Sequence, residues 1–201
     1  MDTPTTTADA TRTARTARTA HTEHTAHTAH TAHTVHTVID SPYGPLTLVA
    51  TGGVLSGLYM HEQRHRPPEE SFGVHDPGPF DEAVRQLTAY FEGELTVFDV
   101  PLALHGTPFQ RRVWEQLLRI PYGETRSYGE LAEHLGKPGA SRAVGLANGK
   151  NPVSIIVPCH RVIGSTGGLT GYGGGLSRKQ RLLAFEGAPA AGGGAVTDGL
   201  W

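Results

Sequence analysis

The residues best suited to covalent chemistry lie around the single cysteine of the chain. Cys159 follows a short apolar run, 155–157, and directly precedes His160. A cysteine attacks as its thiolate; a histidine can accept the thiol proton, and a carboxylate can hold that histidine in the required tautomer. Glu186 suits this last role because it comes late in an apolar helical segment that ends at Gly187. The sequence thus predicts a Cys-His-Glu arrangement, with a buried structural cysteine as an equally weighted alternative.

A pair of short helices forms the second candidate site. Ser127 and Glu130 have the spacing of a capping box, which predicts a helix that Gly136 ends. After a tight glycine turn, a second helix rich in small residues is expected over 140–147, with Arg142 projecting from it. Two helices joined in this way are typical of a helix-turn-helix, whose second helix lies against DNA. Helical hairpins are also common in protein cores, so the pattern alone leaves both interpretations open.

The segments that must position these residues divide into an acidic and a basic module. Residues 38–105 carry three basic and ten acidic side chains, whereas 106–187 carry eleven basic and five acidic ones, within a net charge of −2. Only the second module would favour a polyanion, although chance imbalance on two solvated surfaces explains the counts equally well. The basic module opens with Thr107 and Pro108, a cap and first-turn pair that predicts a helix.

The acidic module is predicted to be a small α+β scaffold. Two strand-like runs around a Gly-Gly turn predict a hairpin over 46–60. The polar, proline-bearing residues 62–79 predict a loop, and Asp81 is expected to cap a helix over 81–91. Residues 97–104 are expected to form a further extended run. Nothing in this module has the spacing of a catalytic site.

The first 37 residues differ in composition from all that follows. They contain 14 Thr, 8 Ala and 6 His, repeated as Thr-Ala-Arg and then Thr-Ala-His. With almost no large apolar residues, 1–37 cannot offset its ordering entropy by burial, so we expect disorder there and a flexible end over 188–201. The histidines could bind nickel, copper or zinc transiently, but a slipped DNA repeat explains the pattern more simply. These histidines are His21, His24, His27, His30, His33 and His36.

Composition also excludes several classes of protein. No run approaches the roughly 18 apolar residues of a membrane helix, and the N-terminus has no apolar signal-peptide core. One cysteine can form neither an internal disulfide nor a multi-cysteine zinc site. We therefore expect a protein of a reducing cytoplasm without membrane contact.

The run from Asn151 to Ile163, with Pro-Cys-His-Arg at its centre, closely resembles the active-site signature of the O6-alkylguanine-DNA alkyltransferases. These are also called methylated-DNA–protein-cysteine methyltransferases. The resemblance is dense over 106–187, where it includes Tyr128 and the Ser-Arg-Ala-Val-Gly run at 141–145.

This resemblance implies an α+β chain of two domains. Residues 40–105 match only in outline, as the variable N-terminal domain of the family. Over 38–105 we expect a small ribonuclease-H-like α/β domain, and over 106–187 a mainly helical domain with a winged-helix-like helix-turn-helix. Some relatives hold zinc in the N-terminal domain, but 38–105 contain no cysteine. No metal and no cofactor are expected.

The resemblance assigns catalytic roles to four residues. Cys159 resembles the acceptor thiol, which takes the methyl group from guanine O6 by direct displacement. His160, acting through a water molecule, and Glu186 resemble the chain that generates the thiolate. Asn151 resembles the asparagine that shapes the active-site loop and orders this hydrogen-bond chain.

Further residues resemble those that bind DNA and line the alkyl pocket. Tyr128 resembles the tyrosine that rotates the target phosphate and donates to guanine N3, and Arg142 resembles the finger that fills the gap left by the flipped base. The other DNA-binding residues implied are Ser141, Ala143 and Gly145. The pocket residues implied are Tyr128, Val157, Pro158, Tyr172, Gly173 and Lys179. Gly173 departs from the serine that this loop often carries, which puts the preference for alkyl groups in doubt.

The implied function is DNA repair by direct reversal of damage. The methyl group of O6-methylguanine, and less readily that of O4-methylthymine, would move from a flipped base to Cys159. Because nothing in the motif could hydrolyse the thioether formed, each molecule would act once. The partner would be double-stranded DNA containing O6-alkylguanine. The protein would be a monomer. It would lie in a cytoplasm of the bacterial type and associate with the nucleoid when it is bound to DNA.

Two alternatives come from other classes of protein. One is a non-catalytic alkylated-DNA-binding protein that flags lesions; such relatives often replace the cysteine with tryptophan, so Cys159 argues against it. The other is a cysteine hydrolase using Cys159, His160 and Glu186. The absence of an obvious oxyanion loop weighs against this second alternative.

Overall fold

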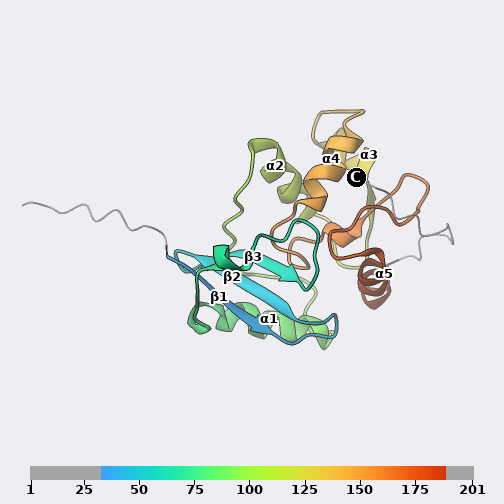
Figure 1. Cartoon of the computed structure of the whole chain (residues 1–201). Coiled ribbons are helices and arrows are strands. Elements are labelled where there is room, and N and C mark those ends of the chain that lie inside the picture. Colours follow the sequence, from blue (N-terminus) through green and yellow to red (C-terminus); the bar gives the residue numbers. More distant parts are fainter. Residues whose placement is uncertain (1–32, 189–201) are drawn as a thin grey trace, which may run out of the picture. The chain divides into compact units, whose positions relative to one another are not determined.

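The N-terminal part of the structure, a computed structural model that describes residues 33–188, is built on a four-stranded sheet (Figure 1). The strand order is β3-β2-β1-β4, with antiparallel pairing throughout except that β4 runs parallel to β1. The predicted hairpin is confirmed by β2 and β3, which pair around Gly52 and Gly53. The strands are β1 (Thr34–Ile39), β2 (Leu46–Thr51), β3 (Val54–Met60) and β4 (Val74–His75).

Strand β1 begins inside the segment that the composition assigned to the disordered tail, so the expected boundary at residue 37 is wrong. The last copies of the repeat carry Val35 and Val38 in place of alanine. Both valines pair with β2, Val35 with Ala50 and Val38 with Thr47, and Val35 is also buried, although Val38 stays exposed. The expectations for residues 1–32 and 189–201, including four of the six repeat histidines, lie outside the described residues.

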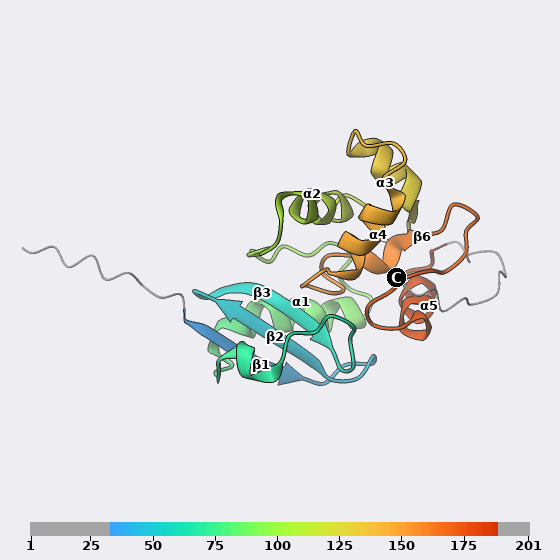
Figure 2. The same cartoon turned by 45° about the horizontal axis from the view of Figure 1, so that its top comes forward.

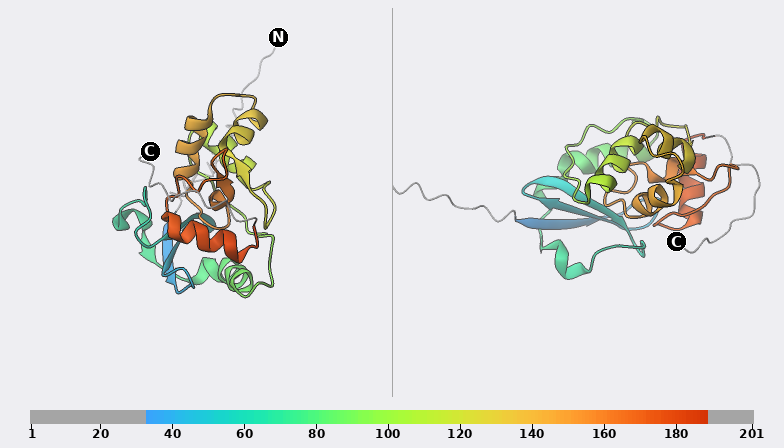
Figure 3. Two further views of the ribbon diagram at one scale, coloured as in Figure 1. Left: turned by 90° about the vertical axis from the view of Figure 1, so that its right-hand side faces the viewer. Right: turned by 90° about the horizontal axis from the view of Figure 1, so that it is seen from above.

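The two faces of the sheet are covered by different elements. Helix α1 (Asp81–Phe91) packs its buried Leu87 and Tyr90 into the main core, against Leu46 and Leu48 of β2. On the other face, Phe72 of the 3-10 helix η1 (Glu69–Phe72) packs with Val49 and Tyr59. The right-hand view of Figure 3 shows α1 and η1 on opposite sides of the sheet. This double cover explains why five consecutive residues of β2 are buried.

Three expectations for this domain need correction. Asp81 is the first residue of α1 and not its cap: its backbone is already helical, because the 3-10 helix η2 (Gly78–Phe80) leads directly into α1. Residues 62–79 are not a plain loop, since burial of Phe72 favours η1 and lets β4 pair with β1. Residues 97–104 form no strand and make only an isolated bridge, between Leu102 and Leu55.

The second half of the chain is mainly helical, as predicted. Capping boxes begin α2 (Pro108–Leu117) at Thr107 and α3 (Tyr128–His134) at Ser127. Helix α4 (Ser141–Gly149) follows a tight turn, and the hairpin of α3 and α4 packs on α2 (Figure 2). Two short parallel strands complete this domain, followed by α5 (Leu176–Phe185). The strands are β5 (Arg126–Ser127) and β6 (Val162–Ile163). Among residues 33–188, no helix is long and apolar enough to cross a membrane.

The two domains share one hydrophobic core and are joined at the edge of the sheet. Leu58 of β3 bridges Val153, and its backbone exchanges hydrogen bonds with Pro152 and Ser154 at 2.8 and 2.9 Å. Helix α5 lies between α1 and the α3–α4 pair in the left-hand view of Figure 3 and in Figure 1. The segment that leads to Cys159 is therefore attached directly to the scaffold sheet.

Candidate functional site

Cys159 begins a single 3-10 turn, η3 (Cys159–Arg161), at the end of a tightly folded segment. The apolar residues before it are buried, as predicted, but they form a turn where an extended segment was one expectation. The Val157 N–H donates to the Val153 carbonyl at 3.0 Å, and Ile155 has a φ of 71°. Such a φ is strained for a β-branched residue and persists only where the surroundings impose it.

Asn151 supplies part of that constraint. Its side-chain amide donates to the Val157 carbonyl at 2.8 Å, and its carbonyl oxygen accepts from the Val153 N–H at 3.0 Å. Asn148, from α4, donates to the Cys159 carbonyl at 3.3 Å. Both amide side chains are buried. They fix the backbone that presents the cysteine.

Four hydrogen bonds converge on the buried carboxylate of Glu186, which follows α5. His160 Nε2 lies 2.9 Å from Oε1, and the Tyr90 hydroxyl donates to the same oxygen at 2.7 Å. Arg161 donates from Nε to Oε2 at 2.8 Å and from Nη2 to Oε1 at 2.9 Å. The structure thus joins His160 and Glu186, as expected, and adds Arg161 and Tyr90, which sequence reasoning missed.

The protonation states of this group follow from its contacts. Burial raises the pKa of Glu186, but hydrogen bonds from His160 and Arg161 outweigh burial and lower that pKa to about 2. Burial lowers the pKa of His160, although Glu186 opposes the shift. A neutral His160 beside a carboxylate carries its proton on Nε2, which leaves Nδ1 as the basic atom. Within the described residues, Nδ1 is buried and has no hydrogen-bond partner.

The thiol of Cys159 is protonated at rest. The side chain is only 4 % exposed, and burial raises its pKa, while Asn151 and Lys179 partly oppose that rise. Burial has the opposite effect on the cationic Lys179, because it lowers the pKa of the ammonium to about 8. The Lys179 ammonium donates to the carbonyls of Val162 and Thr170. It therefore ties the backbone after η3 to the loop that precedes Tyr172.

A cavity of about 190 Å³ opens where that loop meets α3 and α4. Tyr128 lies at its wall with its hydroxyl 3.1 Å from the carbonyl oxygens of both Thr170 and Gly171. Burial raises the pKa of Tyr128 to about 12. The pKa of Tyr172 is also raised, mainly by burial and to a smaller extent by the charge of Cys159. The lining residues are Arg64, His65, Tyr128, Ser141, Arg142, Gly145, Leu146, Gly149, Thr170, Gly171, Tyr172 and Gly173.

The structure brings most, but not all, of the expected pocket and DNA-binding residues to this cavity. Those that line it are Tyr128, Ser141, Arg142, Gly145, Tyr172 and Gly173. Those that do not are Ala143, Val157, Pro158 and Lys179. Val157 and Pro158 are buried in the turn that carries Cys159. Lys179 does not reach the cavity but donates a hydrogen bond to the carbonyl of Thr170, which lines it. Arg64 and His65, which come from the scaffold domain, were not expected.

The outer face of α4 is exposed and carries Arg142, Ala143 and the large apolar Leu146. Arg142 and Ala143 are exposed, while Val144 and Ala147 are buried against the neighbouring helices. The Trp114 indole donates to the Ala147 carbonyl at 2.8 Å, which anchors α4 on α2. The second helix of the predicted helix-turn-helix therefore presents Arg142 to the solvent.

Some of the missed residues carry a sequence signal and others do not. Arg161 adjoins the Cys-His pair and follows a run of apolar residues, where an arginine needs a buried partner. Tyr90 lies 96 residues before Glu186, so no local pattern could pair them. Among the described residues, no group of three or more His, Cys, Asp or Glu could hold a metal ion.

Comparisons with known proteins place the chain in a family. The sequence matches the 6-O-methylguanine DNA methyltransferase family, with its ribonuclease-like domain at 34–104 and its DNA binding domain at 108–188. The chain is 64% identical over 148 residues to the methylated-DNA–protein-cysteine methyltransferase of Mycobacterium bovis, covering 74% of this chain and 89% of that protein. The crystal structure of Mycobacterium tuberculosis OGT in complex with DNA superposes with a TM-score of 0.73 and 62% identity, covering 78% and 96%. The chain therefore belongs to the 6-O-methylguanine DNA methyltransferase family.

Proposed function

We propose that this protein repairs DNA by direct reversal, taking the methyl group of O6-methylguanine onto Cys159 in a single irreversible transfer. The observation that carries the proposal is the buried Cys159 next to His160, whose Nε2 is held by Glu186 at 2.9 Å. A histidine oriented by a carboxylate in this way can act as the base that generates a thiolate. The activity named for the most similar relatives, methylated-DNA–protein-cysteine methyltransferase, is of the same kind.

The chemistry follows from the protonation states. The Cys159 thiol gives its proton through a water molecule to His160 Nδ1, and the imidazolium formed is stabilised by Glu186. The thiolate attacks the methyl carbon, an S–C bond forms, and the bond from that carbon to guanine O6 breaks. The guanine leaves with the electron pair of the broken bond on its oxygen, and a hydrogen bond from the Tyr128 hydroxyl stabilises this charge. The product is a thioether with no adjacent group that could hydrolyse it, so each molecule reacts once.

The substrate must leave the double helix to reach the cysteine. The O6-methyl group lies in the base stack, so the nucleotide has to be flipped out, which costs a few kcal/mol of stacking and pairing. Arg142, on the exposed face of α4, would enter the duplex and fill the gap. The flipped base would enter the cavity beside Tyr128 and Tyr172. At this wall Gly173 can offer its backbone amide to the substrate, but it has no side-chain hydroxyl. We expect O4-methylthymine to be a poorer substrate than O6-methylguanine.

The partner is DNA, and we infer that the form recognised is a duplex containing O6-alkylguanine, bound by a monomer. A thiol that must stay reduced until it is used suits a bacterial-type cytoplasm, with the protein associated with the nucleoid when it is on DNA. A non-catalytic damage-binding role is not favoured, because the cysteine and the adjacent His160–Glu186 pair are both present.

The test is to mix the protein with a duplex carrying O6-methylguanine with a labelled methyl group. We expect one label per protein molecule, recovered on the peptide that contains Cys159, and none with Cys159→Ser. Tight binding without label would favour the damage-flagging alternative. Repeated turnover of an ester substrate would favour the cysteine hydrolase.

A further inference from the structure

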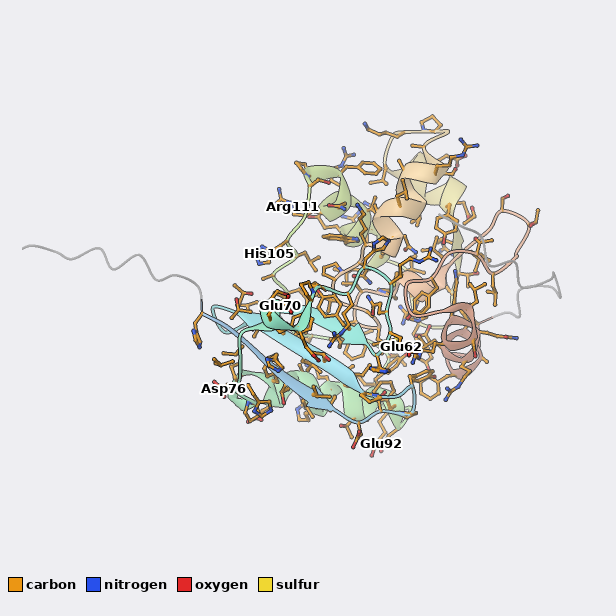
Figure 4. All side chains as sticks on the ribbon, viewed as in Figure 1. Glu62, Glu70, Asp76, Glu92, His105 and Arg111 are labelled. Atoms are coloured by element: carbon orange, nitrogen blue, oxygen red, sulfur yellow. The ribbon has the colours of Figure 1, made fainter. Side chains whose placement is uncertain are left out.

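The basic side chains of the scaffold domain are concentrated at one loop. Residues 38–105 contain only three arginines, Arg64, Arg66 and Arg85, among ten acidic side chains. Two of the three lie at 61–66, the loop that follows β3, together with His61 and His65. Figure 4 labels three of the acidic residues, Glu70, Asp76 and Glu92, at other places on the scaffold. Because Glu62 also lies in this loop, its net charge is only +1, but the remaining charges of the scaffold are mostly acidic. A local basic excess of this kind favours an anionic ligand.

Contacts with the C-terminal domain hold this loop in place. The Arg64 N–H donates to the Gly173 carbonyl at 2.8 Å, and Arg178 donates to the His61 carbonyl at 3.0 Å. The buried Gln63 accepts from the Ser154 hydroxyl at 2.9 Å and from the Met60 N–H at 3.0 Å. The loop is therefore fixed against the same backbone that forms the cavity wall.

The backbone of the loop is also strained. Glu62 and His65 have φ values of 59° and 62°, a region that residues other than glycine rarely adopt. Residues held in such conformations cluster at ligand-binding sites, where the surrounding contacts impose a particular side-chain direction. Arg64 and His65 of this loop both line the cavity. Arg142 lines the same cavity from the C-terminal domain.

Arg64 differs from the other two scaffold arginines in where it lies. Arg66 lies over the scaffold, where its guanidinium stacks on Phe72 at 4.8 Å and donates to Thr47 at 3.3 Å. Arg85 forms an exposed ion pair with Glu82 on α1. Arg64 borders both the first cavity and an adjoining one of about 530 Å³ that Glu62 also lines. Figure 4 labels Glu62 at the end of β3 that faces α5.

We propose that Arg64 contacts a backbone phosphate of the DNA strand whose nucleotide enters the cavity, so that the scaffold domain forms the second side of the DNA interface. The inference rests on the proposed function. Arg142 and the outer face of α4 hold the strand from one side, and Arg64 with the neighbouring His65 holds it from the other. An arginine suits this role because its guanidinium matches phosphate geometry.

The test compares Arg64→Ala with Arg85→Ala, a matched scaffold variant far from the cavity, and with Arg64→Lys. Binding to an unmodified duplex and transfer from an O6-methylguanine duplex are each measured over a series of salt concentrations. Losing one phosphate contact should make the negative slope of log affinity against log salt shallower by about one and weaken duplex binding about tenfold at low salt. Arg85→Ala should keep the wild-type slope, and Arg64→Lys should recover most of it.

A second measurement, a ratio of two rates, distinguishes a DNA contact from a structural role. The rate with duplex substrate is divided by the rate with free O6-benzylguanine, which has no phosphate, and Arg64→Ala should lower this ratio severalfold. An unchanged salt slope, or equal losses on both substrates, would overturn the proposal. Because the slope on unmodified DNA does not depend on transfer, it decides the role of Arg64 even if Cys159 accepts no methyl group.

Discussion

The carboxylate of Glu186 connects the turn that carries Cys159 to both domains. It fixes His160 in the tautomer that leaves Nδ1 basic, and it neutralises the buried Arg161. Tyr90 brings the scaffold helix α1 to the same oxygen as His160. The carboxylate thus serves the chemistry and the packing at once, and the two roles can be separated by substitution.

Replacing Glu186 by glutamine should impair both roles. The amide cannot neutralise Arg161, and breaking a buried ion pair typically costs about 3 kcal/mol. We expect a free energy of unfolding lower by about that amount in urea titrations, and a methyl-transfer rate reduced at least tenfold.

Tyr90→Phe is the matched control, because it removes one hydrogen bond to the same carboxylate and leaves its charge in place. It should cost only about 1 kcal/mol and change the transfer rate little. Equal transfer rates for Glu186→Gln and Tyr90→Phe would show that the carboxylate has no part in activating the cysteine.

At the scale of elements, local signals predicted most of the C-terminal domain and fewer details of the scaffold. The capping boxes at Thr107 and Ser127 are short-range patterns, and both form as expected. The start of β1 could not be placed, because a strand depends on its partner β2, which no local pattern of the repeat reveals. The turn at Ile155 was missed for a similar reason, since Asn151 and the edge of β3 impose it.

The position of β1 predicts where the chain can be shortened. Deleting 1–32 should leave methyl transfer and the melting temperature unchanged, because the strand pairing begins at Thr34. Deleting 1–39 removes β1, which lies between β2 and β4, and should abolish the cooperative thermal transition. Circular dichroism melting of both truncated proteins checks this. A fall in transfer after the shorter deletion would assign the repeat a direct role in the reaction.

Across the described part of the molecule, the sequence predicted the division of charge and the two-domain organisation, whereas contacts between the domains emerged only from the structure. The shared core, the Leu58–Val153 bridge and the Tyr90–Glu186 hydrogen bond each join residues that are distant along the chain. The residues proposed to be catalytic were predicted from one short motif and a helix end. The scaffold residues at the cavity were not, because arginine and histidine in a polar loop look like ordinary solvated side chains.

The buried ionisable groups predict how the fold responds to acid. The pKa of His160 is lowered from 6.5, so below about pH 6.5 the unfolded chain binds a proton that the native state does not accept. The pKa of Glu186 is lowered from 4.5 to about 2, which adds a second loss of stability over that interval. Stability should therefore fall as pH falls through both windows.

Denaturant titrations from pH 7 to pH 3 measure this dependence directly. Compared with the wild type, His160→Gln should flatten the decline between pH 6.5 and 4.5, and Glu186→Gln should flatten it below pH 4.5. A wild-type protein that gains stability on acidification over these windows would contradict the assigned protonation states.

The junction between the repeat and β1 has a consequence for inheritance. The repeat unit is three residues long, whereas the side chains of a strand alternate with a period of two. The register of β1 is set by its own valines and its pairing with β2, and not by the number of units that precede it. A gene that gains or loses whole units would therefore encode the same folded domains. Length variation among alleles within this repeat would be nearly invisible to selection on repair.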